Sequence, residues 1–317
     1  MADVNTTSWT DFVETAFDTK VSWYMMAMPQ FRQIVDKHPV AQAMPGDVVT
    51  LSIHKKLTPD ATPLDETLDV TPVALPAPRR VSVTLNEYGR TVRSTNKLNK
   101  LAFTRTVLSD IGQHVADDQA EAMDLLYKNL LDAHTANRLW TKNDGTFGST
   151  DPTTNYGVIN AKAIAGASSL LKRRRAEARD GKNYVAHIHP DVAYDLRLET
   201  GNTAWVNPHQ YVDTAEIYSG ELGTFHKVRF IENDRCTKVA GSPNLYNTYV
   251  LGREALVEAA AEQPHTVVGP VVDSLKRFQT VGWYALLGGA RFRENSIQII
   301  KSTSALDGIG GAVDYSA

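Results

Sequence analysis

Two histidines and a carboxylate stand close enough in the sequence to suggest a metal site. His187 and His189 alternate along a strand-like run, which would put both imidazoles on one face, and Asp191 follows. Imidazole and carboxylate are ligands that transition metals accept. However, Pro190 ends the strand at once, and no third ligand stands at a recognisable spacing. We therefore expect a structural role for these residues, with no catalytic residue, no cofactor site and no metal site.

The other motifs that could carry chemistry also favour structural interpretations. Cys236 is the lone cysteine, which excludes an internal disulfide framework and a cysteine-based zinc site. The basic run 172–175 could contact nucleic-acid phosphates, but such runs more often form the solvated C-terminal end of a helix. The glycines of 308–311 lie in the C-terminal tail, without the strand–turn–helix context of a dinucleotide loop.

Composition narrows the class of protein. The chain has 317 residues, of which 42% are hydrophobic and 22% charged, as in ordinary globular proteins. This excludes a mainly disordered, collagen-like or membrane-spanning chain. A net charge of −3 opposes a dedicated DNA-binding module. The first 17 residues contain no Lys or Arg, so we expect no signal peptide and synthesis in a reducing cytoplasm.

Residues 48–85 predict a long hairpin-like excursion. Apolar residues alternate with polar ones at 49–53 and again at 81–85, the period of half-buried strands. Between them, residues 57–80 contain five prolines, which exclude a helix or a central strand. An isolated two-stranded hairpin is marginal in water. We expect the excursion to leave its own domain and to be supported by an adjacent subunit.

Residues 102–140 predict one dominant helix, because apolar residues recur there at helical spacing without proline. Its apolar stripe should pack on the sheet of the body. A second helix is expected at 160–180. Upstream, three aromatic-rich patches begin at Trp9, Trp23 and Phe31. They fit either an N-terminal helical pair or an arm that buries its apolar side on a neighbouring chain.

The second half of the chain predicts a mixed body. Strands are expected at 184–189, 227–232, 248–251, 280–287 and 296–300, with a short helix at 190–199. The pair Gly288-Gly289 predicts a turn between the last two strands.

Four segments, in this order along the chain, resemble the major capsid protein family of tailed bacteriophages, which has the HK97-like fold. They are VTLNEYGRTVRST (83–95), YVAHIHPDVAYDLR (184–197), GELGTFHKVRFIEND (220–234) and VGWYALLGGARFRENSIQIIKST (281–303). The resemblance implies an α+β fold. It also implies an N-terminal arm at 1–47, an extended hairpin or E-loop at 48–85, and a peripheral domain at 86–183 with spine helix 102–140. An axial domain at 184–265, closing strands of the peripheral domain at 266–303 and a flexible tail at 304–317 would follow.

The same resemblance implies a structural protein rather than an enzyme. It would self-assemble into hexamers and pentamers of an icosahedral virion shell around double-stranded DNA, which it would contact weakly and without sequence preference. Portal, scaffolding or decoration proteins are implied partners, membranes are not, and assembly would occur in the host bacterial cytoplasm. An encapsulin-type nanocompartment shell is the nearest alternative. A metal-dependent hydrolase built on His187, His189 and Asp191 is the alternative from another class.

Overall fold

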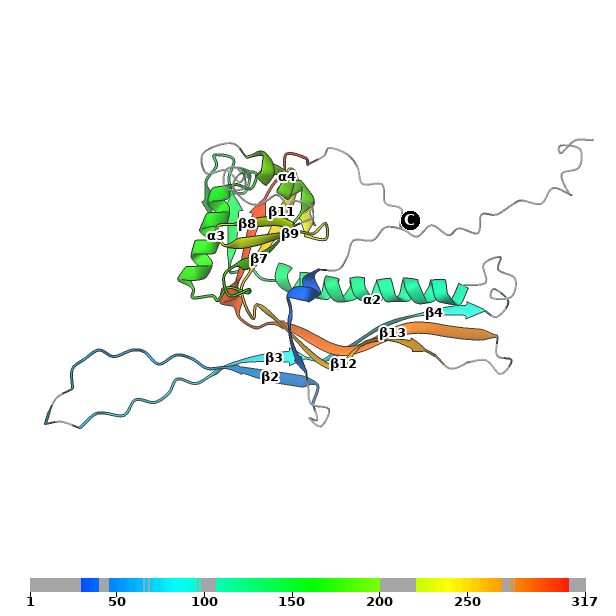
Figure 1. Cartoon of the computed structure of the whole chain (residues 1–317), viewed down its shortest axis with the longest axis horizontal. Helices are drawn as coiled ribbons and strands as arrows, with labels where there is room; N and C mark the ends of the chain where they lie inside the picture. Colours follow the sequence, from blue (N-terminus) through cyan, green and yellow to red (C-terminus); the bar gives the residue numbers. More distant parts are fainter. Residues whose placement is uncertain are drawn as a thin grey trace, which may run out of the picture.

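The computed structural model describes residues 30–39, 46–64, 66–67, 69–95, 97, 107–199, 221–269, 275 and 277–307. Two sheets and one two-stranded ribbon make up its β structure. Figure 1 shows a body of strands and short helices at one end of a long helix, an elongated sheet beneath that helix, and the ribbon extending away from the body. The architecture is α+β, as predicted.

The elongated sheet has four strands in the order β1-β12-β13-β4. These strands are β1 (Asp36–Pro39), β12 (Leu256–Val268), β13 (Phe278–Arg291) and β4 (Asn86–Thr95). β1 runs parallel to β12, and the other pairs are antiparallel. Helix α2 (Val107–Asp132) covers one face, where Val115 and Met123 pack with Trp283. The predicted packing of the helix stripe on the sheet is confirmed.

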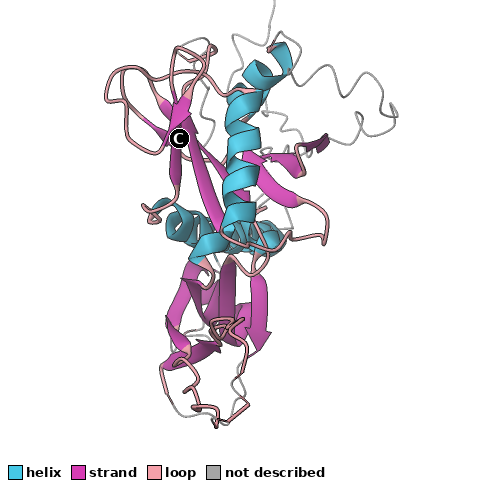
Figure 2. Cartoon of the chain, turned by 90° about the vertical axis from the view of Figure 1, so that its left-hand side faces the viewer, coloured by secondary structure: helices cyan, strands magenta, loops and turns pink. Residues whose placement is uncertain are grey.

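The other sheet forms the body, with strands in the order β6-β5-β14-β11-β7-β9-β8, and β10 pairs with β11. Their bounds are β5 (Arg138–Thr141), β6 (Phe147–Gly148), β7 (Tyr184–Ile188), β8 (Glu221–Phe225), β9 (Val228–Glu232), β10 (Lys238–Val239), β11 (Leu245–Leu251) and β14 (Ile297–Ser302). Helices α3 (Ala161–Arg173) and α4 (Pro190–Leu198) pack in one hydrophobic cluster with this sheet. Figure 2 shows this body above the long strands of the other sheet.

The predicted domain boundaries at residues 184 and 265 fall inside these units. Strand β5 and helix α3 precede residue 184, yet they share the sheet and the core of β7. Residue 265 lies within β12, where His265 pairs with Tyr284 of β13. The chain therefore passes between the two units three times, near residues 132–138, 251–256 and 291–297, rather than at the two predicted boundaries.

The long helix is shorter than predicted, because it ends at Asp132 rather than at residue 140. Beyond it the chain turns so that Arg138–Thr141 adds to the body sheet as β5, parallel to β14. The Arg138 guanidinium donates to the backbone carbonyls of Asp132 and His134, at 3.0 Å each. Strand pairing thus overrides the apolar periodicity of the sequence. Residues 102–106 of the prediction lie outside the described residues.

Two further predictions need correction. Helix α3 ends at Arg173 rather than at residue 180, and Arg175 has a φ of 58° just beyond it. The pair Gly288-Gly289 forms no turn and lies inside β13. A Cβ on Gly289 would lie 2.8 Å from Cδ1 of Leu130 on α2, so the glycine permits close contact between helix and strand. The other strands and the short helix 190–199 are confirmed with small shifts of their ends.

The segment before β1 packs on its own chain. The 3-10 helix η2 (Phe31–Ile34) buries Phe31 and Ile34 in a cluster with Tyr127 and Tyr249. The sequence allowed the apolar N-terminal patches to form either a helical pair or an arm that binds a neighbouring chain. For the patch at Phe31 the second interpretation is wrong, because the patch is buried in its own chain. The patches at Trp9 and Trp23 lie outside the described residues.

A buried carboxylate fixes this segment between helix and sheet. Glu258 of β12 is fully buried and accepts two hydrogen bonds from the Arg32 guanidinium, at 3.0 and 2.9 Å, and a third from the Tyr127 hydroxyl. Burial raises the pKa of Glu258, but the bonds from Arg32 and Tyr127 outweigh it and lower the pKa overall. In addition, Asp124 of α2 accepts from the Phe31 backbone N–H at 2.6 Å.

His187 of β7 lies against Phe31, a member of the cluster with Tyr127 and Tyr249. It is fully buried, and its ring lies 5.0 Å from that of Phe31. Neither ring nitrogen has a hydrogen-bond partner within the described chain. Burial, with a smaller contribution from the charge of Arg179, lowers the pKa of His187 to about 4. The imidazole is therefore neutral at physiological pH.

The buried ion pair generates the first prediction. Arg32→Leu should destabilise the chain by about 3 kcal/mol or more, because it leaves the buried Glu258 charge unpaired. Chemical unfolding followed by circular dichroism measures this loss. Arg253→Leu is the matched control, since its pair with Glu177 is exposed, and it should cost less than about 1 kcal/mol. Equal losses in the two variants would contradict the role given to Glu258.

His187 generates the second prediction. Below about pH 6.5 the unfolded chain binds a proton at this residue, whereas the folded chain binds it only near the lowered pKa of about 4. The free energy of unfolding should therefore decrease as the pH is lowered from about 6.5 to about 4, and His187 should account for up to about 3 kcal/mol of this decrease. His187→Leu should make the dependence of unfolding free energy on pH shallower, and the exposed control His54→Leu should not. An unchanged slope in His187→Leu would contradict the assignment.

Candidate assembly interface

The two-stranded ribbon consists of β2 (Val48–Ile53) and β3 (Arg79–Thr84), paired antiparallel from Val48↔Thr84 to Ile53↔Arg79. Both strands are where the alternation predicted them. Their inward face packs in a cluster with Val257 and Phe292, and Val83 is almost fully buried there. The expectation that only a neighbouring subunit supports this ribbon is therefore wrong for the strands, which rest on their own chain.

Beyond the strands lies the outer part of the predicted excursion, residues 57–78, which is called the excursion below. Every residue of this segment whose burial the structure describes is exposed, and none belongs to a helix or strand. Large apolar side chains are included, with Val73 77% and Leu75 82% exposed. Contiguous exposed apolar groups often mark surfaces that bind another protein. The excursion is therefore the first candidate for contact between subunits.

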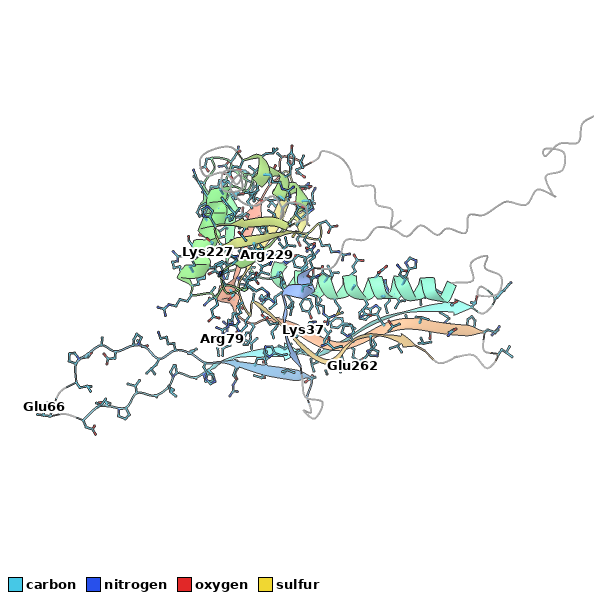
Figure 3. All side chains as sticks on the ribbon, in the orientation of Figure 1. Lys37, Glu66, Arg79, Lys227, Arg229 and Glu262 are labelled. Carbon is cyan, nitrogen blue, oxygen red and sulfur yellow. The ribbon has the colours of Figure 1, made fainter. Side chains whose placement is uncertain are left out.

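The excursion is also acidic. Residues 57–78 contain Asp60, Asp65, Glu66 and Asp69 but no Lys or Arg. Asp60 accepts from the backbone N–H and the hydroxyl of Thr62, at 2.9 and 2.6 Å, and these bonds lower the pKa of its carboxyl. Glu66 lies at the far end of the excursion, and Arg79 at its base, where β3 begins (Figure 3). The negative charge is thus carried away from the rest of the chain.

The residues of the metal hypothesis do not form a site. His187 is buried beside Phe31, whereas His189 follows the strand, caps α4 by accepting from the Asp191 N–H at 3.2 Å, and packs on Tyr246. Phe31 and Tyr246 belong to different hydrophobic clusters, so the two imidazoles do not share a face. Asp191 accepts from the Tyr246 hydroxyl at 2.9 Å. Within the described part of the chain, no group of three potential ligands could hold a metal ion.

The other residues that the sequence suggested for chemistry, Cys236 and the basic run 172–175, lie in different surroundings. Cys236 is buried, and burial raises the pKa of its thiol well above the ordinary value, so it is not poised as a nucleophile. Of the basic run 172–175, Lys172 and Arg173 are exposed at the end of α3, whereas Arg174 and Arg175 line a cleft. The glycines of 308–311 lie outside the described residues. No helix among those described has the length and apolarity needed to cross a membrane.

That cleft, where the ribbon meets the excursion, is the feature that sequence analysis missed. Its lining comes from the ribbon, from the end of α3 and from the segments around residues 253 and 293. The only sequence signal was the basic run, because the other basic residues of the cleft are scattered over about 240 positions of the chain. Only the fold brings them together.

Comparison with known proteins agrees with this geometry. The profile of a family described as phage capsid protein matches residues 127–303, which is more than half of the chain. No curated protein sequence matches the chain.

The solved structures similar to this chain include several phage capsids. The capsid asymmetric unit of cyanophage Pam1 has a TM-score of 0.71 at 16% identity, covering 97% of this chain and 100% of that chain. The capsid of Ralstonia phage GP4 has a TM-score of 0.70 at 13% identity, covering 92% and 96%. The capsid of Helicobacter pylori bacteriophage KHP30 has a TM-score of 0.67 at 12% identity, covering 96% and 98%. These likenesses extend over nearly the whole chain and show its HK97-like capsid fold. By the family match and this fold, the chain belongs to the phage capsid protein family.

Proposed function

We propose that this chain is the major capsid protein of a tailed bacteriophage and self-assembles, in rings of five and six, into an icosahedral shell around double-stranded DNA. The family match, together with the capsid fold over nearly the whole chain, carries this proposal. The exposed excursion supports it, because its apolar side chains have no cover from their own chain in the described structure. A heterologous contact that repeats around a ring would cover them.

The architecture supports an assignment of the capsid domains that differs from the boundaries expected from sequence. We assign the elongated sheet with α2 to the peripheral domain, with α2 as its spine helix. The body sheet with α3 and α4 is the axial domain, which would surround the fivefold and sixfold positions. The ribbon and excursion are the E-loop, which would lie on the adjacent subunit.

The alternative functions find less support. An encapsulin-type shell would share the fold, but the matching family is one of phage capsid proteins. A metal-dependent hydrolase has no assembled ligand set, because His187 and His189 face different clusters. Members of a capsid family are structural proteins, and we propose no catalytic role for this chain.

The proposed location is the virion, with assembly in the host bacterial cytoplasm. The net charge of −3 supports weak contact with packaged DNA without sequence preference, because affinity for duplex grows with the number of phosphates neutralised. Portal, scaffolding or decoration proteins are partners that such a head would use.

A deletion tests the proposed function. Replacing residues 57–78 by a short Gly-containing turn preserves β2 and β3, which pack on the chain's own core. The variant should keep the helix content of the parent, because the described part of this segment contains no helix. It should fail to form closed shells, because the contact with the neighbour is lost. Circular dichroism, sizing and electron microscopy of parent and variant measure the two outcomes.

The substitution Val73→Asp with Leu75→Asp keeps the length of the excursion and should also block shell formation. Closed particles of normal size from the deletion variant would refute the role of the excursion. A parent chain that forms no closed particles would refute the proposed function itself.

A further inference from the structure

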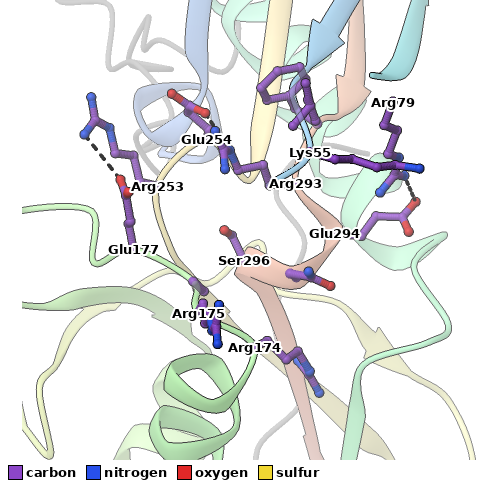
Figure 4. Close-up of a pocket in the computed structure, with 14 residues that line it drawn as sticks. Lys55, Arg79, Arg174, Arg175, Glu177, Arg253, Glu254, Arg293, Glu294 and Ser296 are labelled. Atoms are coloured by element: carbon purple, nitrogen blue, oxygen red, sulfur yellow. Dashed lines mark hydrogen bonds and ion pairs between the residues drawn. The ribbon is translucent and has the colours of Figure 1, made fainter. Parts of the chain in front are cut away.

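A basic cleft lies where the ribbon meets the excursion, between the E-loop and the axial body. It has a volume of about 260 Å³ and is partly enclosed by five separate segments of the chain. Figure 4 shows its charged side chains around the central space. Six of its lining residues are cationic: Lys55, Arg79, Arg174, Arg175, Arg253 and Arg293.

The cleft's own carboxylates neutralise only half of these cations. Glu177 pairs with Arg253 at 3.4 Å, Glu254 with Arg293 at 2.6 Å, and Glu294 with Arg79 at 3.6 Å. Lys55, Arg174 and Arg175 have no ion pair within the described chain. The Arg174 guanidinium is the most constrained of the three, because its Nη1 is buried without a hydrogen-bond partner there.

Arg174 as a whole is half-buried, so water solvates this guanidinium only in part and its buried Nη1 stays without a partner. Burial, followed by repulsion from Arg173, lowers the pKa of Arg174 in agreement with this shortage. The cleft is therefore preorganised for a ligand that carries carboxylate or other anionic groups.

The same chain carries such a ligand farther out, in the excursion that continues this ribbon. The excursion 57–78 has four carboxylates and no cation. Asp60 and Asp69 bond only to groups of their own loop, through Thr62 and Val70, and neither has an ion pair within the described chain. Figure 3 shows Glu66 at the tip, far from Arg79 at the base, so the tip does not reach the cleft of its own chain. The partner that fits is a second copy.

We infer that the acidic tip of the E-loop of one subunit docks in the basic cleft at the E-loop base of the next, where Arg174, Arg175 and Lys55 bind its carboxylates. This inference rests on the proposed function, since it names the contact through which subunits would join. The contact is head to tail, as a ring requires, because each copy offers one tip and one cleft.

An acidic peptide fits this cleft better than duplex DNA does. Glu177, Glu254 and Glu294 also line the cleft among its cations, so the cleft suits separated carboxylates better than the continuous row of phosphates of a duplex. Ile53 and Phe292 add apolar lining, and the excursion carries exposed Leu64 and Val70 beside its carboxylates. Mixed charged and apolar chemistry therefore occurs on both sides of the proposed contact.

Peptide binding tests the cleft separately from particle formation. A labelled synthetic peptide of residues 57–78 is titrated with the purified full chain and followed by fluorescence anisotropy. We expect saturable binding that weakens with salt. Arg174→Glu with Arg175→Glu should reduce the affinity at least tenfold. Lys172→Glu with Arg173→Glu is the matched control, because these cations stand on the same helix end outside the cleft, and it should change the affinity less than threefold.

A charge swap excludes misfolding as the cause of lost binding. A peptide with Asp60→Lys, Glu66→Lys and Asp69→Lys should bind the parent poorly and the Arg174→Glu, Arg175→Glu chain at least tenfold better. In the full chain, the tip and cleft reversals should each prevent closed particles, and their combination should restore them in electron micrographs.

Three results would overturn the inference. The first is no binding of the parent peptide up to millimolar concentration. The second is equal binding of that peptide by the parent chain and the cleft variant. The third is that a short DNA duplex binds the parent chain but not the cleft variant, while the peptide does not bind. Absence of particles from the parent chain would count against the proposed function instead. In that case peptide binding would still test whether the cleft binds the acidic tip.

Discussion

The buried carboxylate of Glu258 is the contact on which the arrangement of the subunit depends. A fully buried charge in the middle of a strand is tolerated only when it is paired and hydrogen-bonded. Arg32 supplies the charge from the N-terminal segment, and Tyr127 supplies a hydroxyl from α2. Three elements distant in sequence are therefore fixed at one point. Because the same segment places Phe31 beneath Tyr249 of the body sheet, this point also ties the elongated sheet to the body.

A second carboxylate strengthens the same junction from the body side. Asp132 ends α2, where a negative charge opposes the helix dipole. Its oxygens accept from Asn247 at 2.9 Å, from the Tyr249 hydroxyl and from Thr237, at 2.5 Å each. These donors offset the unfavourable placement and hold the helix end against β11. With its two sheets fixed in this way, the subunit can carry an extended ribbon as a rigid projection, because the ribbon's inward face packs on the elongated sheet.

Local patterns in the sequence predicted the elements better than their ends or their partners. Alternation at 49–53 and 81–85 predicted both strands of the ribbon, because one face of each strand is buried. The apolar periodicity past Asp132 wrongly predicted a continuing helix. Leu139 and Trp140 are buried because they belong to strand β5 of the body sheet. Gly288 and Gly289 had the composition of a turn, whereas in the strand they allow close contact with β3 and with α2, respectively. The cleft was hidden because Lys55, Arg174 and Arg293 come together only through the tertiary fold.

The cations of the cleft and the carboxylates of the excursion would set how strongly two free subunits associate. Each exposed ion pair between chains contributes little alone, typically less than about 1 kcal/mol, and is screened by salt. A single tip in a single cleft would therefore dissociate readily. In a closed ring every subunit would make both contacts, and the contact that closes the ring is intramolecular, so the closed ring would be more stable than any open chain of the same subunits. Weak, polar and directional contacts thus favour closed shells over irregular aggregates. The apolar side chains of the excursion, Val73 and Leu75 among them, would add affinity only after the charges have aligned the two chains.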